Sequence, residues 1–343
     1  ELKLNTAIGR DLSVQQLRER HKVVFLGIGA GAGLKLGVPG EEGEGVWTGT
    51  DFLARLNRGN AVDLGGQVVV VGGGNSAMDA ARAARRTGAQ VTVLYRRTRN
   101  EMPAIETEVD DALAEGVQMS FLAAPAAIGR EEGRVRSVRV QRMELGEPDG
   151  SGRRKPLPVV GSEHDIPASA VIAAVSQEPD WKGLGELRNG EIWIHAGSNG
   201  SVGEGLWAGG DAIGMGIAGL AIAQGRQAAE AVHAQLRGLP AQPIARSTAQ
   251  ASPKPEYYPA RQRSTSPSRS VPARLAQPDM EVQQTMSEKA FLEEATRCFS
   301  CGSCFGCEQC YMFCNGGGFS RLQQVGPGRY FLLSLDTCES CGK

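Results

Sequence analysis

The chain has 343 residues, enough for two domains, and its 37 Lys and Arg nearly balance its 38 Asp and Glu. That balance argues against a nucleic-acid surface or a polybasic membrane anchor, and the sequence contains no run of about 18 apolar residues that would predict a membrane span. No charged stretch followed by an apolar one opens the sequence as an export signal would, so we expect a cytoplasmic protein.

The first part of the chain predicts a short helix followed by a strand. Ser13 begins a capping box before a short amphipathic stretch. The apolar run 22–28 predicts a buried strand, and the turn residues Gly29 and Ala30 follow it. A loop rich in Gly, Pro and Glu comes next, and then a short helix is expected over 51–57.

A glycine fingerprint follows the continuous apolar strand predicted over 67–71, and it opens a helix predicted over 75–86 that leads to a second strand over 90–95. In the pattern G-x-G-x-x-A the first Gly allows a tight turn and the second lets the backbone approach a pyrophosphate. The final Ala permits close packing of the helix on the strand, and the N–H groups at the helix start face the phosphates. The predicted nucleotide-binding residues are Gly72, Gly74, Asn75, Ser76 and Ala77.

The second strand ends in Arg96 and Arg97 rather than in Asp or Glu. A carboxylate there would bind a ribose 2′-hydroxyl, whereas guanidinium groups suit a 2′-phosphate, so charge favours NADPH over NADH. The alternative is that the glycines form only a strand-to-helix turn and that the two arginines are surface charges.

Later elements include a charged helix expected over 107–115 and strands expected over 117–122, 135–143 and 170–175. A further strand runs into Gly210 and Asp211, and a long helix is predicted from Ile217 onward. A carboxylate at such a turn can accept hydrogen bonds from polyol hydroxyls, and the helix start can hold a pyrophosphate or the electron-rich edge of a flavin. This segment is therefore a second candidate nucleotide element.

The composition changes over residues 239–279, where almost half of the chain's 17 prolines fall among many Ser, Ala and Arg. Such a stretch cannot bury enough apolar surface to fold alone. It predicts a linker that lies over the body of the protein or is partly disordered. A helix is expected over 286–297, directly before Cys298.

The two glycine segments together resemble the small-subunit family of NADPH-dependent glutamate synthase. The resemblance is carried by VVVVGGGNSAMDAARAARRTGAQVTVLYRRTRNEMPA and GLWAGGDAIGMGIAGLAIAQGRQAA and covers residues 1–240. Family members are two-dinucleotide-binding flavoproteins related to adrenodoxin and thioredoxin reductases, so the resemblance implies an α/β fold with two Rossmann-like domains that bind NADPH and FAD. It implies NADPH contacts at 72–77, Arg96 and Arg97, and flavin contacts at Gly29, Ala30, Gly210, Asp211, Ile217 and Ala218.

Two departures from the family pattern concern the flavin. Family members carry a flavin-binding G-x-G-x-x-G ahead of the point that matches Glu1, so the resemblance implies a fragment with an incomplete FAD half and impaired activity on its own. Ser176 stands where the family has Gly before Gln-x-Pro, which changes a segment near the flavin.

All eight cysteines lie in the last 46 residues, which indicates a metal-cluster module rather than a disulfide scaffold. The run from Cys304 to Cys314 has the C-x2-C-x2-C-x3-C spacing of bacterial ferredoxins, although Asn315 replaces the Pro that follows there. One [4Fe–4S] cluster would use Cys304, Cys307 and Cys310, and a second would use Cys314, Cys338 and Cys341, with the last ligand of each beyond Lys343. Zinc is the alternative, but the repeated x2 spacings supply more thiolates than one tetrahedral site needs. Cys298 and Cys301 are additional candidate ligands.

This C-terminal module distinguishes the chain from the glutamate synthase subunit. The segments RCFSCGSCFGCEQCYMFCN and YFLLSLDTCESCGK are most similar to the NAD(P)H oxidoreductases that serve dissimilatory sulfite reductase in sulfur-oxidising bacteria. That resemblance implies electron transfer between nicotinamide, FAD, two [4Fe–4S] clusters and a protein acceptor or donor. A glutamate synthase-like subunit with an amidotransferase partner, or an inert docking or electron-relay fragment, remains an alternative. A homodimer is a further option.

Together these patterns predict an α/β chain of two Rossmann-like dinucleotide-binding domains, with the FAD half incomplete, and a ferredoxin-like iron–sulfur module. No catalytic side chain is expected, because the cofactors carry the chemistry of hydride transfer. The expected segments are 1–58 and 181–238 for FAD, 59–180 for NAD(P)H, 239–285 for the linker and 286–343 for the truncated cluster module.

Overall fold

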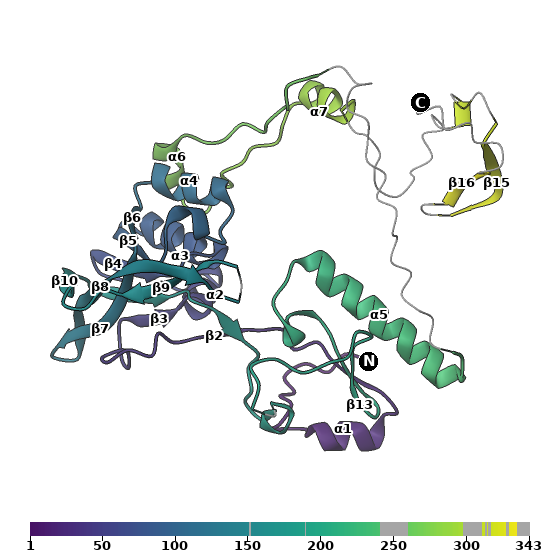
Figure 1. Ribbon diagram of the computed structural model, residues 1–343, viewed down its shortest axis with the longest axis horizontal. Helices are drawn as coiled ribbons and strands as arrows, with labels where there is room; N and C mark the ends of the chain where they lie inside the picture. The colour runs from purple at the N-terminus through teal and green to yellow at the C-terminus, as the bar shows by residue number, and fades with distance from the viewer. Residues whose placement is uncertain are drawn as a thin grey trace. The chain divides into compact units, whose positions relative to one another are not determined.

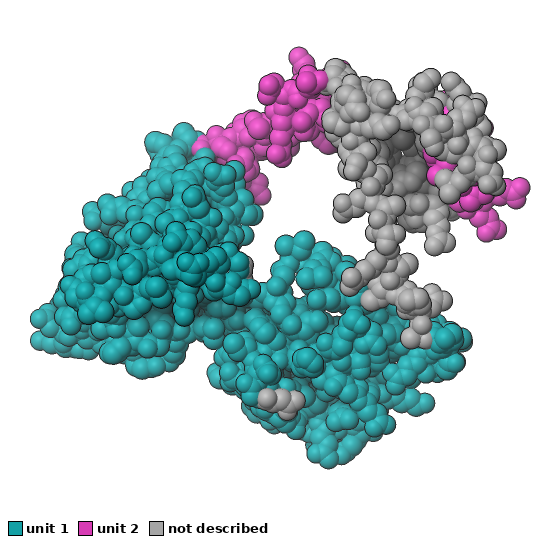
Figure 2. All heavy atoms as spheres, in the orientation of Figure 1, with its two compact units in different colours: residues 1–244, 270–280 teal, residues 245–269, 281–343 magenta. Residues whose placement is uncertain are grey.

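The structure is a computed structural model that describes residues 1–150, 152–188, 190–240, 260–297, 311–312, 314, 317–326 and 329–334. The chain divides into two compact units, coloured in Figure 2: residues 1–244 with 270–280, and residues 245–269 with 281–343. Within the described part of the chain, no helix has both the length and the apolar character that crossing a membrane requires.

A five-stranded sheet lies in the first unit (Figure 1), with the order β3-β11-β4-β5-β6 and parallel pairing throughout. Its strands are β3 (Val46–Thr48), β4 (Gln67–Val71), β5 (Gln90–Tyr95), β6 (Gln118–Phe121) and β11 (Ala170–Ala173). The central strand β4 is buried on both faces from Val68 to Val71. That burial explains why its sequence is a continuous apolar run rather than an alternating one.

Helices cover one face of this sheet. They are α2 (Gly49–Asn57), α3 (Asn75–Arg86) and α4 (Glu106–Ala114). Phe52 of α2 and Met78 of α3 are fully buried in the same cluster as Val68 and Val70 of β4. The strands predicted over 67–71 and 90–95 and the helix predicted over 75–86 are confirmed at those residues.

Antiparallel strands, rather than helices, cover the other face. Val69 and Val71 of β4 join Val138 and Val140 in a second buried cluster. The covering strands are β7 (Ala123–Glu131), β8 (Arg134–Pro148) and β10 (His164–Pro167), and β9 (Arg154–Pro158) pairs with β8. Of these strands the sequence predicted only β8, over 135–143, because the others are half-exposed or exposed and carry no clear apolar alternation.

The remainder of the first unit contains a three-stranded sheet of order β1-β14-β13, in which β1 and β14 are parallel. Its elements are α1 (Val14–Arg20), β1 (Val24–Leu26), β13 (Ser201–Gly203), β14 (Leu206–Ala208) and α5 (Ala218–Arg237). Leu26, Leu206 and Ala208 form its core with Val14 of α1. The capping box predicted at Ser13 is confirmed, whereas β1 is shorter than the predicted run 22–28.

Two short strands, β2 (Ala32–Gly33) and β12 (Gln177–Glu178), pair with each other where the chain passes between these two sheets. Short 3-10 turns complete the unit: η1 (Arg99–Glu101), η2 (Gly185–Leu187) and η3 (Gly210–Ile213). Strand β3 pairs with β11 in the five-stranded sheet, although both β3 and α2 fall in the segment 1–58 expected for FAD. The predicted domain boundaries stay a prediction, and this pairing favours placing the first one near β2.

Helix α6 (Val271–Ala276) belongs to the first unit, although the residues on both sides of it in the sequence belong to the second. Its Arg274 is buried and donates to Asp111 Oδ1 of α4 at 2.9 Å. Figure 1 shows α6 beside α4. Part of the predicted linker therefore lies on the body, as the sequence suggested.

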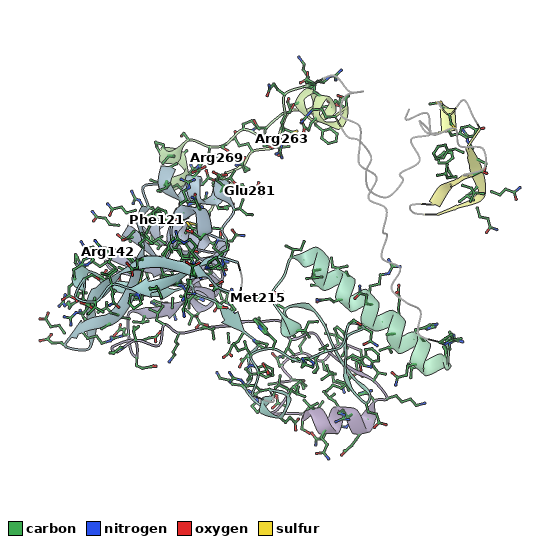
Figure 3. All side chains as sticks on the ribbon, in the orientation of Figure 1. Phe121, Arg142, Met215, Arg263, Arg269 and Glu281 are labelled. Atoms are coloured by element: carbon green, nitrogen blue, oxygen red, sulfur yellow. The ribbon has the colours of Figure 1, made fainter. Side chains whose placement is uncertain are left out.

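In the second unit, the segments before and after α6 run antiparallel. Ser268 forms a β-bridge with Gln283, and Arg269 donates from Nε to the backbone oxygen of Glu281 at 2.8 Å (Figure 3). Helix α7 (Glu288–Ala295) confirms the helix expected over 286–297. The hairpin of β15 (Phe319–Gly326) and β16 (Arg329–Leu333) follows.

Candidate functional site

Three glycines connect β4 to α3, and each meets a different environment. Gly72 has a φ of +149°, and a Cβ there would lie 2.2 Å from the backbone oxygen of Ala174. A Cβ at Gly73 would lie 2.3 Å from the ring of Tyr95. A Cβ at Gly74 would meet nothing closer than the Pro103 ring, at 4.0 Å. The first two glycines are therefore required by the protein's own packing, and the third leaves open space.

The start of α3 faces that open space. Gly74 is the N-cap residue, and no side chain caps the helix. Ala77 is fully buried, and its Cβ lies 3.1 Å from the position that a Cβ on Gly72 would take. The Asn75 side chain turns away to accept a hydrogen bond from the Ile105 N–H at 2.8 Å. This arrangement fits an anion near the helix start, approached by backbone rather than by the Asn75 side chain.

A cleft of about 620 Å³ opens at the carboxyl ends of β4, β5 and β11. Gly72, Gly73, Gly74 and Ser76 line it, together with Arg96 and Arg97. The carboxyl ends of parallel strands are where open α/β sheets bind ligands. The structure thus brings the predicted glycine turn and the predicted arginines to one cavity.

The two arginines differ in their surroundings. Arg96 is exposed at the end of β5. The side chain of Arg97 is only 3% exposed, and its Nη2 donates to Asp149 Oδ2 at 2.6 Å while its Nε donates to the backbone oxygen of Arg154 at 2.6 Å. Arg97 therefore binds the hairpin formed by β8 and β9, a partner that the sequence did not reveal.

Arg153 in the same hairpin also lines the cleft, and sequence reasoning missed it. The charged residues that line the cleft in the described part of the chain are Arg96, Arg97 and Arg153, all of them basic. The run of basic residues at 153–155 was the one signal available in the sequence. Nothing near this run predicts that Arg153 lines the same cleft as Arg96, which lies 57 positions earlier in the chain. The cleft consequently has the charge that a phosphate-rich ligand needs.

The turn after β5 contains an acidic residue, Glu101, that does not line the cleft. Glu101 accepts hydrogen bonds from the Thr98 N–H and hydroxyl in a capping box that closes η1. The hydrogen bond from the Thr98 hydroxyl holds the pKa of Glu101 below its ordinary value. Tyr95 donates from its hydroxyl to the Glu101 backbone oxygen at 2.7 Å, which fixes the ring against Gly73.

The predicted flavin residues follow two paired parallel strands. Leu26 of β1 lies opposite Ala208 of β14, so the Gly29 turn and the Gly210 turn leave the sheet at the same edge. Gly29 has a φ of +66° and no atom within 4 Å of a Cβ position. Gly210 has a φ of +70°, and its N–H donates to Gln224 Oε1 at 2.8 Å. Both turns leave space in which a ligand could contact the protein backbone. Ala30, next to Gly29, is buried.

Asp211 organises the loop ahead of α5. Its Oδ1 accepts a hydrogen bond from the Gly216 N–H at 3.1 Å. Ile217 is the N-cap residue and is 77% exposed, and Ala218 begins the helix without a side-chain cap. The donor groups of this helix start and the Asp211 carboxylate fit a dinucleotide, and their role as flavin ligands stays a prediction.

Of the predicted cluster ligands, Cys314 lies in the described part of the chain. It is half-buried, and its Sγ accepts a hydrogen bond from the Gly318 N–H at 3.2 Å. The remaining predicted ligands lie outside the described residues: Cys298, Cys301, Cys304, Cys307, Cys310, Cys338 and Cys341. Where the structure does describe the chain, no three His, Cys, Asp or Glu side chains gather as a metal site would require.

A parallel sheet with a glycine turn into a helix, a basic cleft at its carboxyl edge and a second, paired set of glycine turns defines a dinucleotide-binding oxidoreductase. The chain belongs to the pyridine nucleotide-disulphide oxidoreductase family, whose sequence model matches residues 8–235. Its fold is similar to that of Mycobacterium tuberculosis FprA in complex with NADPH, with a TM-score of 0.57, 19% identity and 68% of each chain covered.

The resemblance to the glutamate synthase small-subunit family is confirmed. The chain is 38% identical over 255 residues to the glutamate synthase [NADPH] small chain of Escherichia coli, covering 68% of this chain and 54% of that one. It is 43% identical over 245 residues to the NADP(+)-dependent formate dehydrogenase subunit beta of Moorella thermoacetica, covering 69% and 35%. It is 45% identical over 182 residues to the NADPH-Fe(3+) oxidoreductase subunit beta of Geobacter sulfurreducens, covering 51% and 27%. The chain thus spans about half or less of these curated relatives.

Proposed function

We propose that this chain binds NADPH and FAD as part of an oxidoreductase that passes electrons between the nicotinamide and a protein partner. The observation that carries the proposal is the cleft at the carboxyl ends of β4 and β5, where Gly74 leaves room beside the start of α3 and Arg96 supplies positive charge. The family and the NADP or NADPH in the names of three relatives support it.

In this proposal the chain's residues bind and orient the cofactors. Gly72, Gly74, Asn75, Ser76 and Ala77 form the pyrophosphate turn, and Arg96 and Arg97 make the ribose end basic. When bound, NADPH and FAD supply the hydride chemistry, so no catalytic side chain is required. The proposed flavin ligands are Gly29, Ala30, Gly210, Asp211, Ile217 and Ala218.

The onward path of electrons is proposed from the sequence. The eight cysteines supply the soft thiolates that [4Fe–4S] clusters need, and two clusters would link the flavin to a protein acceptor or donor. Two of the relatives are named as subunits, which supports a protein partner. The resemblance of the two cysteine-containing segments to NAD(P)H oxidoreductases that serve dissimilatory sulfite reductase favours a sulfite reductase-type partner in sulfur oxidation, and the alternative is an amidotransferase subunit.

Anaerobic mixing of the full-length, flavin-loaded protein with NADPH tests the proposal. We expect NADPH to bleach the visible absorption of the flavin, and NADH to do so less efficiently. An artificial electron acceptor should then sustain NADPH consumption. A protein that binds neither FAD nor NADPH would overturn the proposal and leave docking or relay as its role.

A further inference from the structure

Helix α6 is too short to be stable through its own backbone hydrogen bonds. An isolated helix needs about 12–15 residues to persist in water. α6 has six residues, and Pro272 stands in its first turn. Contacts with the body of the first unit therefore supply the stability that so short a helix lacks.

Arg274 is the residue of α6 that enters the body. Its side chain is 8% exposed, and its Nη1 lies 2.9 Å from Asp111 Oδ1 of α4. The other oxygen of the same carboxylate, Asp111 Oδ2, lies 3.3 Å from Arg82 Nη2 of α3. One carboxylate of α4 thus joins an arginine of α3 to the arginine of α6. Removing one partner from such a buried ion pair is costly, because the other charge is left uncompensated.

The chain segments on the two sides of α6 are held to each other. The Arg269 N–H donates to the backbone oxygen of Val282 at 2.9 Å, and the Gln284 N–H donates to that of Pro267 at 2.7 Å. α6 therefore lies at the closed end of a loop whose two ends run together.

The place of α6 in the sequence determines how much chain connects the two units. With α6 docked, the seven residues 281–287 lead to α7 of the second unit, and an extended chain of that length spans at most about 25 Å. With α6 released, the connection would comprise residues 245–287, which could span at most about 150 Å. Docking of α6 therefore shortens the connection severalfold.

We infer that α6 is an anchor, in which Arg274 docks the predicted linker on α3 and α4 and so limits how far the C-terminal unit can move from the nucleotide-binding body. That unit contains all eight cysteines of the chain. A shorter connection raises the effective concentration of one tethered unit at the other. The inference goes beyond the proposed function, because the anchor requires no bound cofactor.

Hydrogen–deuterium exchange of the full-length protein, read by mass spectrometry, tests the docking. Arg274→Gln should make the amides of residues 270–280 exchange about tenfold to a hundredfold faster, the range for one hydrogen bond between charged groups. Arg274→Lys should have a smaller effect, because it keeps the charge. Arg263→Gln is the matched control, since Arg263 is an exposed arginine of the same predicted linker outside α6 (Figure 3).

Limited digestion with trypsin tests the other side of the ion pair. Asp111→Asn removes the charge that binds Arg274 but keeps Arg274 as a cleavage site, so cleavage after Arg274 should become about tenfold faster or more. Asp110→Asn is the matched control, because Asp110 is the adjacent residue of α4, is 59% exposed and pairs with Arg99 instead. Equal cleavage of the two variants would contradict the role of Asp111.

Small-angle X-ray scattering tests the anchoring itself. Arg274→Gln should increase the maximum dimension of the full-length protein. Faster exchange at 270–280 without a larger dimension would overturn the anchor, because other contacts would then hold the C-terminal unit. Wild-type protein in which residues 270–280 exchange as fast as an unfolded peptide would overturn it as well.

The outcomes also separate the anchor from the proposed nucleotide site. The probe is 2′,5′-ADP, which carries the 2′-phosphate that distinguishes NADPH from NADH. Arg274→Gln should bind it as tightly as the wild type in calorimetry, because α6 does not line the cleft. Loss of this binding in the variant would contradict a role confined to the linker, whereas wild-type protein that does not bind the probe would contradict the proposed function alone.

Discussion

Gly74 is a glycine beside which the protein leaves enough space for a side chain. Its backbone has φ near −93°, which any residue can adopt, and the nearest atom to a Cβ there is 4.0 Å away. Gly72 and Gly73 are different, because the Ala174 backbone and the Tyr95 ring occupy their side-chain space. Packing therefore does not explain Gly74, whereas the close approach of the proposed nucleotide phosphate would.

Gly74→Ala should accordingly leave the fold intact and weaken nucleotide binding. We expect a loss of roughly tenfold or more in the affinity for 2′,5′-ADP, since one poorly accommodated methyl group costs about 1–3 kcal/mol. Gly66→Ala is the control, because Gly66 precedes the same strand and likewise has no atom near its Cβ position. Equal affinities for the two variants, measured by calorimetry, would rule out phosphate binding at Gly74.

The predictable site residues are those whose signal is local. Gly72, Gly74 and Ala77 follow a buried strand and open a helix, so their spacing alone located the turn. Arg153 was beyond reach, because its place in the cleft depends on a hairpin that Arg97 binds across more than 50 residues. The same contact shows that Arg97 binds the hairpin of β8 and β9, and its role as a nucleotide ligand stays a prediction.

At the scale of elements, α3, α4 and α6 meet around a single buried carboxylate. The Glu115 side chain is fully buried, and its Oε1 lies 2.9 Å from Arg82 Nη2 and 2.8 Å from Arg86 Nη2. Arg274 of α6 approaches the same oxygen at 3.6 Å. Burial alone would raise the pKa of Glu115, but the hydrogen bonds from Arg86 and Arg82 outweigh it and hold the pKa below its ordinary value.

This arrangement predicts an acid-sensitive contribution to stability. Because the folded-state pKa is depressed, the contribution is present above the unfolded carboxyl value of about 4 and is lost as pH falls through the folded value. Glu115→Gln should lower the free energy of unfolding by about 3 kcal/mol at pH 7, since it leaves buried guanidinium groups without their carboxylate. The difference from wild type should shrink below about pH 4.

Denaturant unfolding at several pH values checks this, with Glu144→Gln as the control on an exposed position of β8. A gap between Glu115→Gln and wild type that stays constant down to acidic pH would contradict the assignment of the ionised form to the network.

Elements with a clear periodicity of apolar residues or with a continuous apolar run were predictable from the sequence, and half-exposed strands were not. β4 was predicted with its observed bounds because burial on both faces leaves a continuous apolar run, and α3 was predicted because a run of small residues follows the glycine turn. β7, β9 and β10 are half-exposed or exposed, and the pairings of β7 and β9 with β8 contain register shifts, so their sequences resemble loops. α6 was hidden for another reason, since it is held by Arg274 rather than by an apolar stripe.

At the scale of the whole molecule, nucleotide chemistry and thiol chemistry occupy separate stretches of sequence. The lining of the described cleft includes no cysteine, and every cysteine of the chain lies after residue 297. The two stretches fall into different compact units, except that residues 270–280 between them return to the first. This division predicts that the two functions can be lost independently.

Cys304→Ser in the full-length protein, reconstituted anaerobically, should lower its iron content while leaving its affinity for 2′,5′-ADP unchanged. Loss of one [4Fe–4S] cluster removes roughly four iron atoms per chain. Ser303→Ala is the neighbouring control and should keep the iron of the wild type. Metal analysis beside calorimetry provides both readouts. Stoichiometric zinc in place of iron would refute the ferredoxin assignment, whereas a joint loss of iron and nucleotide affinity would show that the cluster segment is needed for the cleft to form.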